Sequence, residues 1–252
     1  MLDEIKVIEA RAVTDPDPDV TGNRLLRALG RDDLDVLVAR RPAERMAPGQ
    51  VLIEPSTVAR EVIFPLGGTV LSSLALMPGR KPVETALVGS EGAAGALFGP
   101  RSIEHGFRVQ VLTGGLAVRI AADRFGAQLE LSPELRGVMG GYAMALLAQV
   151  QIGVACAALH PVEARAARWM LDLLDRLGER ALPLTQEALA DLLGVRRTTI
   201  TRVVATLEER GLVRHRRGRI IVVDRAGLEA ASCACHERAK AAHKNGDPGR
   251  QG

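Results

Sequence analysis

Residues 185–223 read TQEALADLLG, then VRRTTITRVVATLEERGLV, then RHRRGRIIVV. The first run begins at Thr185, a residue type that caps helix N-termini, and ends at Gly194, which can adopt the left-handed conformation of a tight turn. The second run spaces Ile200, Val203 and Leu207 as the buried face of a helix. The third run is typical of a basic β-hairpin. This order of elements predicts a winged helix-turn-helix domain.

The exposed face of the second helix and the hairpin carry side chains that suit duplex DNA. Arg197 and Arg202 are each able to pair bidentately with guanine, a contact that contributes roughly 1–3 kcal/mol of discrimination between bases. The threonines suit phosphates or thymine methyl groups, and the hairpin arginines suit phosphates. We predict a DNA-binding surface made of Arg196, Arg197, Thr198, Thr199, Thr201, Arg202, Arg214, Arg216, Arg217 and Arg219.

Charge and composition agree with this prediction. The 252-residue chain has a net charge of only +3, whereas residues 185–223 hold eight arginines and four acidic residues. The positive charge is therefore concentrated in the predicted DNA-binding segment. Aromatic residues make up 2% of the chain, which disfavours single-strand or RNA binding by base stacking. Apolar residues make up 47%, enough for a sizeable core.

The N-terminal half has the pattern of a small antiparallel barrel or sandwich. Residues 23–40 predict one or two short helices. From residue 44 to about 120, short apolar runs alternate with Pro-Gly and Gly-Gly pairs, as strands joined by tight turns do. The predicted strands are 51–53, 62–64, 69–76, 83–88, 108–112 and 116–120.

A long helix is predicted after Pro133, which suits a helix first turn. Its apolar stripe, from Leu135 to Val154, continues over about 25 residues. A helix of this length normally packs against something equally long, so we expect a second copy of the chain; the alternative is that it only covers the barrel. His160-Pro161 predicts a break, and Gly178 the end of the next helix.

These patterns predict an α+β protein of five segments. They are a flexible tail (1–22), a small barrel or sandwich (23–131, which the family resemblance described below identifies as a β-roll sensor domain), a dimerisation helix (132–159), a winged helix-turn-helix domain (160–238) and a disordered tail (239–252). The N-terminus lacks a signal-peptide pattern, and glutamines, glycine and alanines dilute the apolar stretch 142–159. We therefore expect a cytoplasmic protein.

The helix-turn-helix pattern, from Thr185-Gln-Glu through Gly194-Val-Arg-Arg-Thr-Thr-Ile-Thr-Arg202 to Leu-Glu-Glu-Arg-Gly-Leu, resembles that of the CRP/FNR family of bacterial transcription regulators. The stretch that begins at His160 is also similar to family members, and the one that begins at Asp224 resembles a subgroup with degenerate sensor domains. The resemblance implies a cyclic-nucleotide-binding-like β-roll and a homodimer. It also implies double-stranded DNA and RNA polymerase as partners, with Arg197, Thr198 and Arg202 at base-reading positions.

The family's nucleotide-binding motif is not intact in this chain. Members that bind cyclic AMP carry Gly-Glu and, further on, Arg-Ser or Arg-Thr around the cyclic phosphate. Here the glutamate is displaced and the Arg-Ser pair is out of register, which disfavours a cyclic nucleotide and leaves the effector open. No cofactor is predicted. The candidate effector-binding residues are Gly89, Glu91, Gly92, Arg101, Ser102 and His105.

The cysteines carry no predicted site. Cys233, Cys235 and His236 are metal-binding or redox-active residue types, but three ligands so close on a predicted helix cannot all face one ion. The N-terminal cysteines of the family's iron–sulfur sensors are absent, and Cys156 is typical of a small core residue. Three cysteines do not suggest a disulfide framework.

No nucleophile–base arrangement or phosphate loop is visible, so no enzyme is predicted. Two alternatives to a DNA-binding regulator remain open. One is a ligand-sensing module whose winged helix contacts protein, for which binding would ignore salt. The other is a hydrolase or transferase built on the β-roll, which the lack of clustered catalytic residues disfavours.

Overall fold

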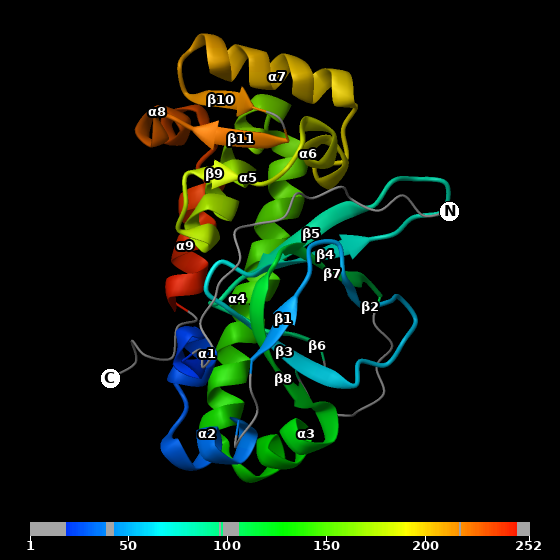
Figure 1. The fold of residues 1–252 in the computed structure, drawn as a ribbon, viewed down its shortest axis with the longest axis vertical. Coiled ribbons are helices and arrows are strands. Elements are labelled where there is room, and N and C mark those ends of the chain that lie inside the picture. The colour runs from blue at the N-terminus through cyan, green and yellow to red at the C-terminus, as the bar shows by residue number, and fades with distance from the viewer. Residues whose placement is uncertain (1–18, 39–42, 96, 98–105, 217, 246–252) are drawn as a thin grey trace.

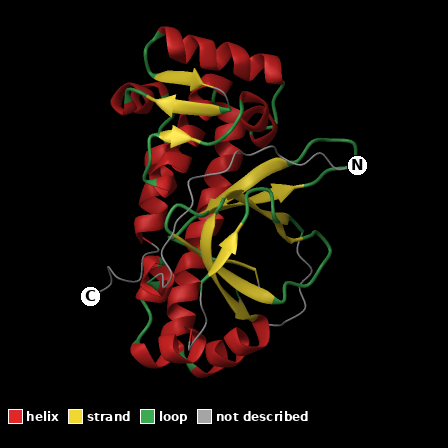
Figure 2. Ribbon diagram, viewed as in Figure 1, coloured by secondary structure: helices red, strands yellow, loops and turns green. Residues whose placement is uncertain are grey.

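The computed structural model describes residues 19–38, 43–95, 97, 106–216 and 218–245. Two antiparallel sheets of four strands each form the N-terminal β-roll, with the helices below, beside and above it (Figures 1 and 2). One sheet has the strand order β1-β8-β3-β6 and the other β2-β7-β4-β5. The strands are β1 Glu44–Met46, β2 Val51–Ile53, β3 Glu61–Leu66, β4 Val70–Ala75, β5 Val83–Val88, β6 Ala94–Gly95, β7 Arg108–Thr113 and β8 Gly115–Ala121.

The six strands predicted from apolar runs are confirmed as β2, β3, β4, β5, β7 and β8. The prediction missed β1 and β6, which have three and two residues and are too short to show an alternating pattern. Aliphatic side chains and the ring pair Phe64–Phe125 fill the interior of the roll. The predicted fold class is therefore correct.

The N-terminal helices are η1 Val20–Gly22, α1 Arg24–Arg27 and α2 Arg31–Val38. Asn23 anchors them, because its buried Nδ2 donates to the Pro65 carbonyl (3.0 Å) and the Gly92 carbonyl (2.8 Å). The predicted flexible tail extended to residue 22, whereas Asp19 accepts a hydrogen bond from the Thr21 amide (2.9 Å) and caps η1. Residues 1–18 lie outside the described part of the chain.

Helix α3 Ala122–Leu131 leads into α4 Pro133–Leu159, which runs along the β-roll up to the C-terminal domain (Figure 1). Ser132 caps α4 and Pro133 occupies its first turn, as predicted. The apolar residues of α4, predicted to form a single stripe, face two different sides of the helix. Leu135, Val138, Met139 and Tyr142 pack into the core of the β-roll, whereas other apolar residues of α4, including Met144, Leu147 and Val154, are exposed.

From the sequence, the apolar stretch 142–159 was interpreted as too rich in glutamine, glycine and alanine to span a membrane. The structure gives a different result for the helix that contains it. By length and composition alone, α4 is apolar enough to cross a membrane, and only 17% of its most apolar window is buried. The same composition suits a helix whose exposed face packs on another protein chain. One face of its first half is buried in the core of the β-roll.

The C-terminal domain contains α5 Val162–Leu177, β9 Ala181–Leu182, α6 Gln186–Leu192, α7 Arg197–Glu209, β10 Val213–Arg216, β11 Arg219–Val222, α8 Arg225–Ala231 and α9 Cys235–Asn245. Helix α5 begins after Pro161 and ends at Gly178, which has a φ of +68°. The disordered tail predicted from residue 239 is wrong as far as Asn245, because α9 continues to that residue and packs against α4 and α5.

The C-terminal domain and the β-roll share one apolar core. Leu74 of β4 and Leu87 of β5 lie in the same buried cluster as Trp169 and Met170 of α5. Polar contacts reinforce this packing, since the Trp169 indole donates to Glu84 Oε2 (2.7 Å) and Lys81 pairs with Asp191 (2.9 Å). The sheet of β4 and β5 therefore contacts the C-terminal domain directly, in addition to the α4–α5 connection.

Candidate DNA-binding surface

The helix-turn-helix is closed by a Schellman motif at the end of α6. The Val195 amide donates to the Ala190 carbonyl (2.9 Å), and the Gly194 amide donates to the Asp191 carbonyl (3.0 Å). Gly194 has a φ of +66°, which disfavours any residue with a Cβ. At the other end of α6, Thr185 Oγ1 accepts from the Ala188 amide (3.0 Å). The predicted cap and turn are therefore confirmed.

Helix α7 presents one apolar face and one polar face. Ile200, Val203, Val204 and Leu207 are buried, as predicted. The opposite face is exposed, and Thr199 on its edge is half-buried. The exposed candidate residues of α7 and its N-cap are Arg196, Arg197, Thr198, Thr201 and Arg202. The Thr201 hydroxyl donates to Gln186 Oε1 (3.0 Å), which connects α7 to α6.

The N-terminus of α7 is not neutralised by any group in the described residues. Arg196 is the N-cap residue, and its side chain accepts no hydrogen bond from the first amides of the helix. The side chains of Arg196, Arg197 and Arg202 make no ion pair or hydrogen bond with any residue that the structure describes. A helix N-terminus with free amides and unpaired arginines attracts an anion such as a DNA phosphate.

The wing is the antiparallel pair β10–β11, joined on one side by β9. Its register pairs Val213 with Val222 and Arg216 with Arg219. Glu208 Oε1 accepts from the His215 amide (2.5 Å), so the wing is attached to the end of α7. We call Arg214, Arg216 and Arg219 the wing arginines; all three are exposed, and none pairs with an acidic group in the described part of the chain. Arg217 lies outside the described residues.

Helix α7 and the wing therefore form one arginine-rich surface at the end of the molecule farthest from α2 and α3 (Figure 1). Arg210, at the C-terminus of α7, does not belong to the arginines without a partner, because it forms an ion pair with Glu163 of α5 (2.8 Å).

The described candidates for effector binding, Gly89, Glu91 and Gly92, lie elsewhere, where the β-roll meets α5. Glu91 Oε1 accepts from the Gly89 amide (3.1 Å) and from Arg176 Nε (2.7 Å). Burial alone would raise the pKa of Glu91, but the Arg176 guanidinium and neighbouring groups bring this pKa below its usual value. Gly92 packs against Tyr142, whose ring atoms would lie 2.6 Å from a Cβ at this position. Arg101, Ser102 and His105 lie outside the described residues.

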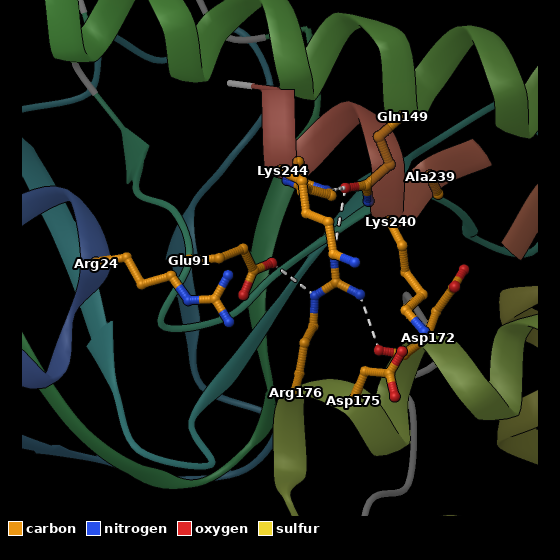
Figure 3. Close-up of a pocket in the computed structure, with 10 residues that line it drawn as sticks. Arg24, Glu91, Gln149, Asp172, Asp175, Arg176, Ala239, Lys240 and Lys244 are labelled. Atoms are coloured by element: carbon orange, nitrogen blue, oxygen red, sulfur yellow. Dashed lines mark hydrogen bonds and ion pairs between the residues drawn. The ribbon is translucent and has the colours of Figure 1, made fainter. Parts of the chain in front are cut away.

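The Glu91–Arg176 pair forms one wall of a cavity of about 270 Å³ between the β-roll and the C-terminal helices (Figure 3). His243 of α9 contacts Gln149 of α4 across it (2.6 Å). The other lining residues are mostly charged: Arg24, Asp172, Asp175, Lys240 and Lys244, with Ala239. Sequence reasoning missed this cavity, because its residues come from four helices and one loop that share no motif.

The structure also changes the interpretation of the cysteines. Cys233 lies in the connection between α8 and α9, and Cys235 is the first residue of α9, so the two are not constrained to opposite sides of one helix. Cys156 and His160, at the end of α4, lie beside them. His236 points away and contacts Asp175 Oδ2 (3.0 Å).

A β-roll, a long connecting helix and an exposed basic helix-turn-helix are combined in one chain. Residues 164–231 match the Crp-like helix-turn-helix domain family. The chain therefore carries a Crp-like helix-turn-helix domain, and its fold is that of the CRP/FNR transcription regulators. No curated protein matches the chain in sequence.

Solved structures of CRP/FNR-type regulators share the fold over most of their length. A CRP/FNR-family transcriptional regulator from Eubacterium rectale is 16% identical, with a TM-score of 0.65, over 84% of this chain and 98% of that one. FixK2 from Bradyrhizobium japonicum is 14% identical, with a TM-score of 0.65, over 77% and 98%. A CRP/FNR-family regulator from Thermus thermophilus is 21% identical, with a TM-score of 0.63, over 75% and 97%.

Proposed function

We propose that the protein is a sequence-specific transcription regulator that binds a pseudo-palindromic DNA site as a homodimer in the cytoplasm. The observation that carries this proposal is the surface of α7 and the wing, where exposed arginines lack partners among the described residues. Unpaired arginines that lie close together on one helix repel one another, which costs free energy unless an anionic ligand offsets the repulsion. Duplex DNA has the charge and the major-groove width that fit such a helix.

The exposed face of α4 supports the homodimer. Seven exposed residues recur with alternating spacings of three and four, which is the pattern of a coiled-coil seam. We call them the α4 seam: Gly137, Gly140, Met144, Leu147, Gln151, Val154 and Ala158. Apart from chain neighbours and the backbone of α4 itself, no atom of the described residues lies within 4 Å of a Cβ built at Gly137 or Gly140, so a second helix has room to approach closely there.

Two parallel copies of α4 would place the two C-terminal domains side by side. Each α7 would then face a half-site, and a separation of about one DNA turn would give half-sites roughly 10 base pairs apart. Arg197 and Arg202 would read base edges, whereas the wing arginines would neutralise phosphates without reading sequence. The role of the β-roll would be to bias this arrangement in response to an effector.

The experiment that tests the proposal is selection of sheared genomic DNA with the purified full-length protein. We expect enrichment of a two-fold symmetric motif. The Arg202→Ala variant should lose the preference at one base pair of each half-site and keep salt-sensitive binding to duplex DNA. Binding that ignores salt would instead favour a winged helix that contacts protein. An enriched motif that does not change in Arg202→Ala would overturn the assignment of α7 as the base-reading helix.

A further inference from the structure

Four metal-ligating side chains meet at the junction between the two domains. Cys156 belongs to the last turn of α4, and His160 is the C-cap residue of the same helix. Residues four apart lie on the same side of a helix, so both side chains face the same way. Cys233 and Cys235 approach them from the connection between α8 and α9. These four residues lie up to 79 positions apart in the sequence, yet their ligand atoms all lie within 4.8 Å of one another.

The spacing of the ligand atoms suits a single tetrahedral ion. Cys156 Sγ lies 3.5 Å from Cys233 Sγ, and Cys235 Sγ lies 3.6 Å from His160 Nδ1. Bonds of about 2.3 Å to sulfur and about 2.0 Å to nitrogen give a tetrahedron with edges of roughly 3.5 to 3.8 Å. A four-iron cluster places its ligands on four different iron atoms at the corners of a cube, which spreads them much further apart.

The surroundings also suit a structural metal site. All three cysteines are buried and form a small cluster of their own, with Ile152 and Ala164 packed against it. Arg168 supplies a nearby positive charge, which offsets the negative charge of a divalent ion held by three thiolates; its electrostatic influence reaches Cys156 and Cys233. Its Nε is buried without a hydrogen-bond partner among the described residues, so it remains available to a metal-bound thiolate.

We propose that Cys156, His160, Cys233 and Cys235 bind one zinc ion. Three cysteines and one histidine form an established ligand set for structural zinc, and soft thiolates disfavour magnesium and calcium. The ion would tie the end of α4, just before the α4–α5 connection, to the segment that follows the wing. Metal loss or thiol oxidation would then loosen the attachment of the DNA-binding domain to the dimerisation helix. This last consequence rests on the proposed function, whereas the metal site does not.

The first test is the metal content of the full-length protein, purified under reducing conditions without chelator and then exposed to excess zinc and desalted. We expect one zinc per chain. The Cys156→Ser and Cys233→Ser variants should lose the ion, whereas the matched control His236→Gln should keep it, because this adjacent histidine faces Asp175. Cobalt in place of zinc should show the visible absorption of a tetrahedral thiolate complex in the wild type and not in Cys233→Ser.

Folding is followed separately, because a serine variant that unfolds would also lose zinc. A chelator should lower the melting temperature of the wild type and of His236→Gln. It should leave that of a folded Cys233→Ser variant unchanged. Protein that stays free of zinc, that contains iron with inorganic sulfide, or that carries a Cys156–Cys233 disulfide under these reducing conditions would overturn the site. One bound zinc with DNA affinity unchanged by chelation would keep the site and overturn its coupling to DNA binding.

Discussion

Replacing Glu84 with glutamine should remove a pH dependence from the contact between the β-roll and the DNA-binding domain. Burial raises the pKa of Glu84 from 4.5 to about 7, although the Trp169 indole, which donates to Glu84 Oε2 (2.7 Å), favours the charged form. Three charged groups of α5 also act on it: Arg168 and Arg176 lower its pKa, and Asp172 raises it. A raised carboxyl pKa means that folding favours the neutral form.

The sign and size of the effect follow from this shift. The stability that neutral Glu84 contributes is fully present below about pH 4.5 and is lost as the pH rises through about 7. A shift from 4.5 to about 7 corresponds to roughly 3 kcal/mol at most. Glu84 keeps part of its surface exposed, and water screens part of the effect, so we expect about 1 to 3 kcal/mol between pH 5 and pH 8.

Urea unfolding at pH 5, 6, 7 and 8 measures this difference. The Glu84→Gln variant keeps an oxygen that accepts from Trp169 but does not titrate, so its stability relative to the wild type should rise across this range. The control Glu209→Gln removes a carboxyl that is exposed on α7, and its profile should stay parallel to that of the wild type. Parallel profiles for Glu84→Gln and the wild type would refute the reasoning, because they would mean that the two domains do not bury this carboxyl in solution.

Three further predictions concern DNA binding and assembly. Arg197→Ala and Arg202→Ala should each lose roughly 1–3 kcal/mol of discrimination at one base pair, measured as the affinity ratio of matched and mismatched duplexes, with the circular dichroism spectrum unchanged. Replacing the three wing arginines with alanine, and so six in the dimer, should reduce the magnitude of the slope of log K against log salt by about 5, with little change in sequence preference. Leu147→Glu, in the α4 seam, should shift the protein from dimer to monomer in analytical ultracentrifugation, whereas Val58→Glu, at another exposed apolar position, should not.

The helix-turn-helix and most of the β-roll could be predicted because their signals are local. Thr185 and Gly194 mark the ends of one helix by capping and by left-handed geometry, and the structure shows both. Alternating apolar runs likewise located six strands. The two short strands were missed because the pairing of β1 with β8, and of β6 with β3, depends on partners distant in the sequence.

The apolar pattern of α4 showed that the helix is long but not what it contacts. Leu135 and Met139 pack into the β-roll, whereas Leu147 and Val154 remain exposed for another partner. A hydrophobic stripe records only that a surface is removed from water, and composition does not distinguish an internal partner from a second chain. The division became visible only when the exposed residues were separated from the buried ones.

The contacts that join the two domains were invisible in the sequence for a related reason. Glu84 meets Trp169 across 85 positions, and Glu91 meets Arg176 across another 85. No periodicity reports such a pair. Cys156 was interpreted as a small core residue because, without the positions of Cys233 and Cys235, a lone cysteine in an alanine-rich helix has no other interpretation.

These long-range contacts converge on one element, and this convergence suggests how a signal would reach the DNA. Helix α5 carries Trp169 and Arg176, which bind the β-roll, and it begins directly after His160 of the proposed zinc site. The orientation of α7 therefore depends on how α5 is held. A ligand changes that orientation only if it binds one arrangement of α5 more tightly than another. The charged cavity beside Arg176 and the zinc site both contact this helix or its start, so either could supply that difference without touching the DNA-binding surface.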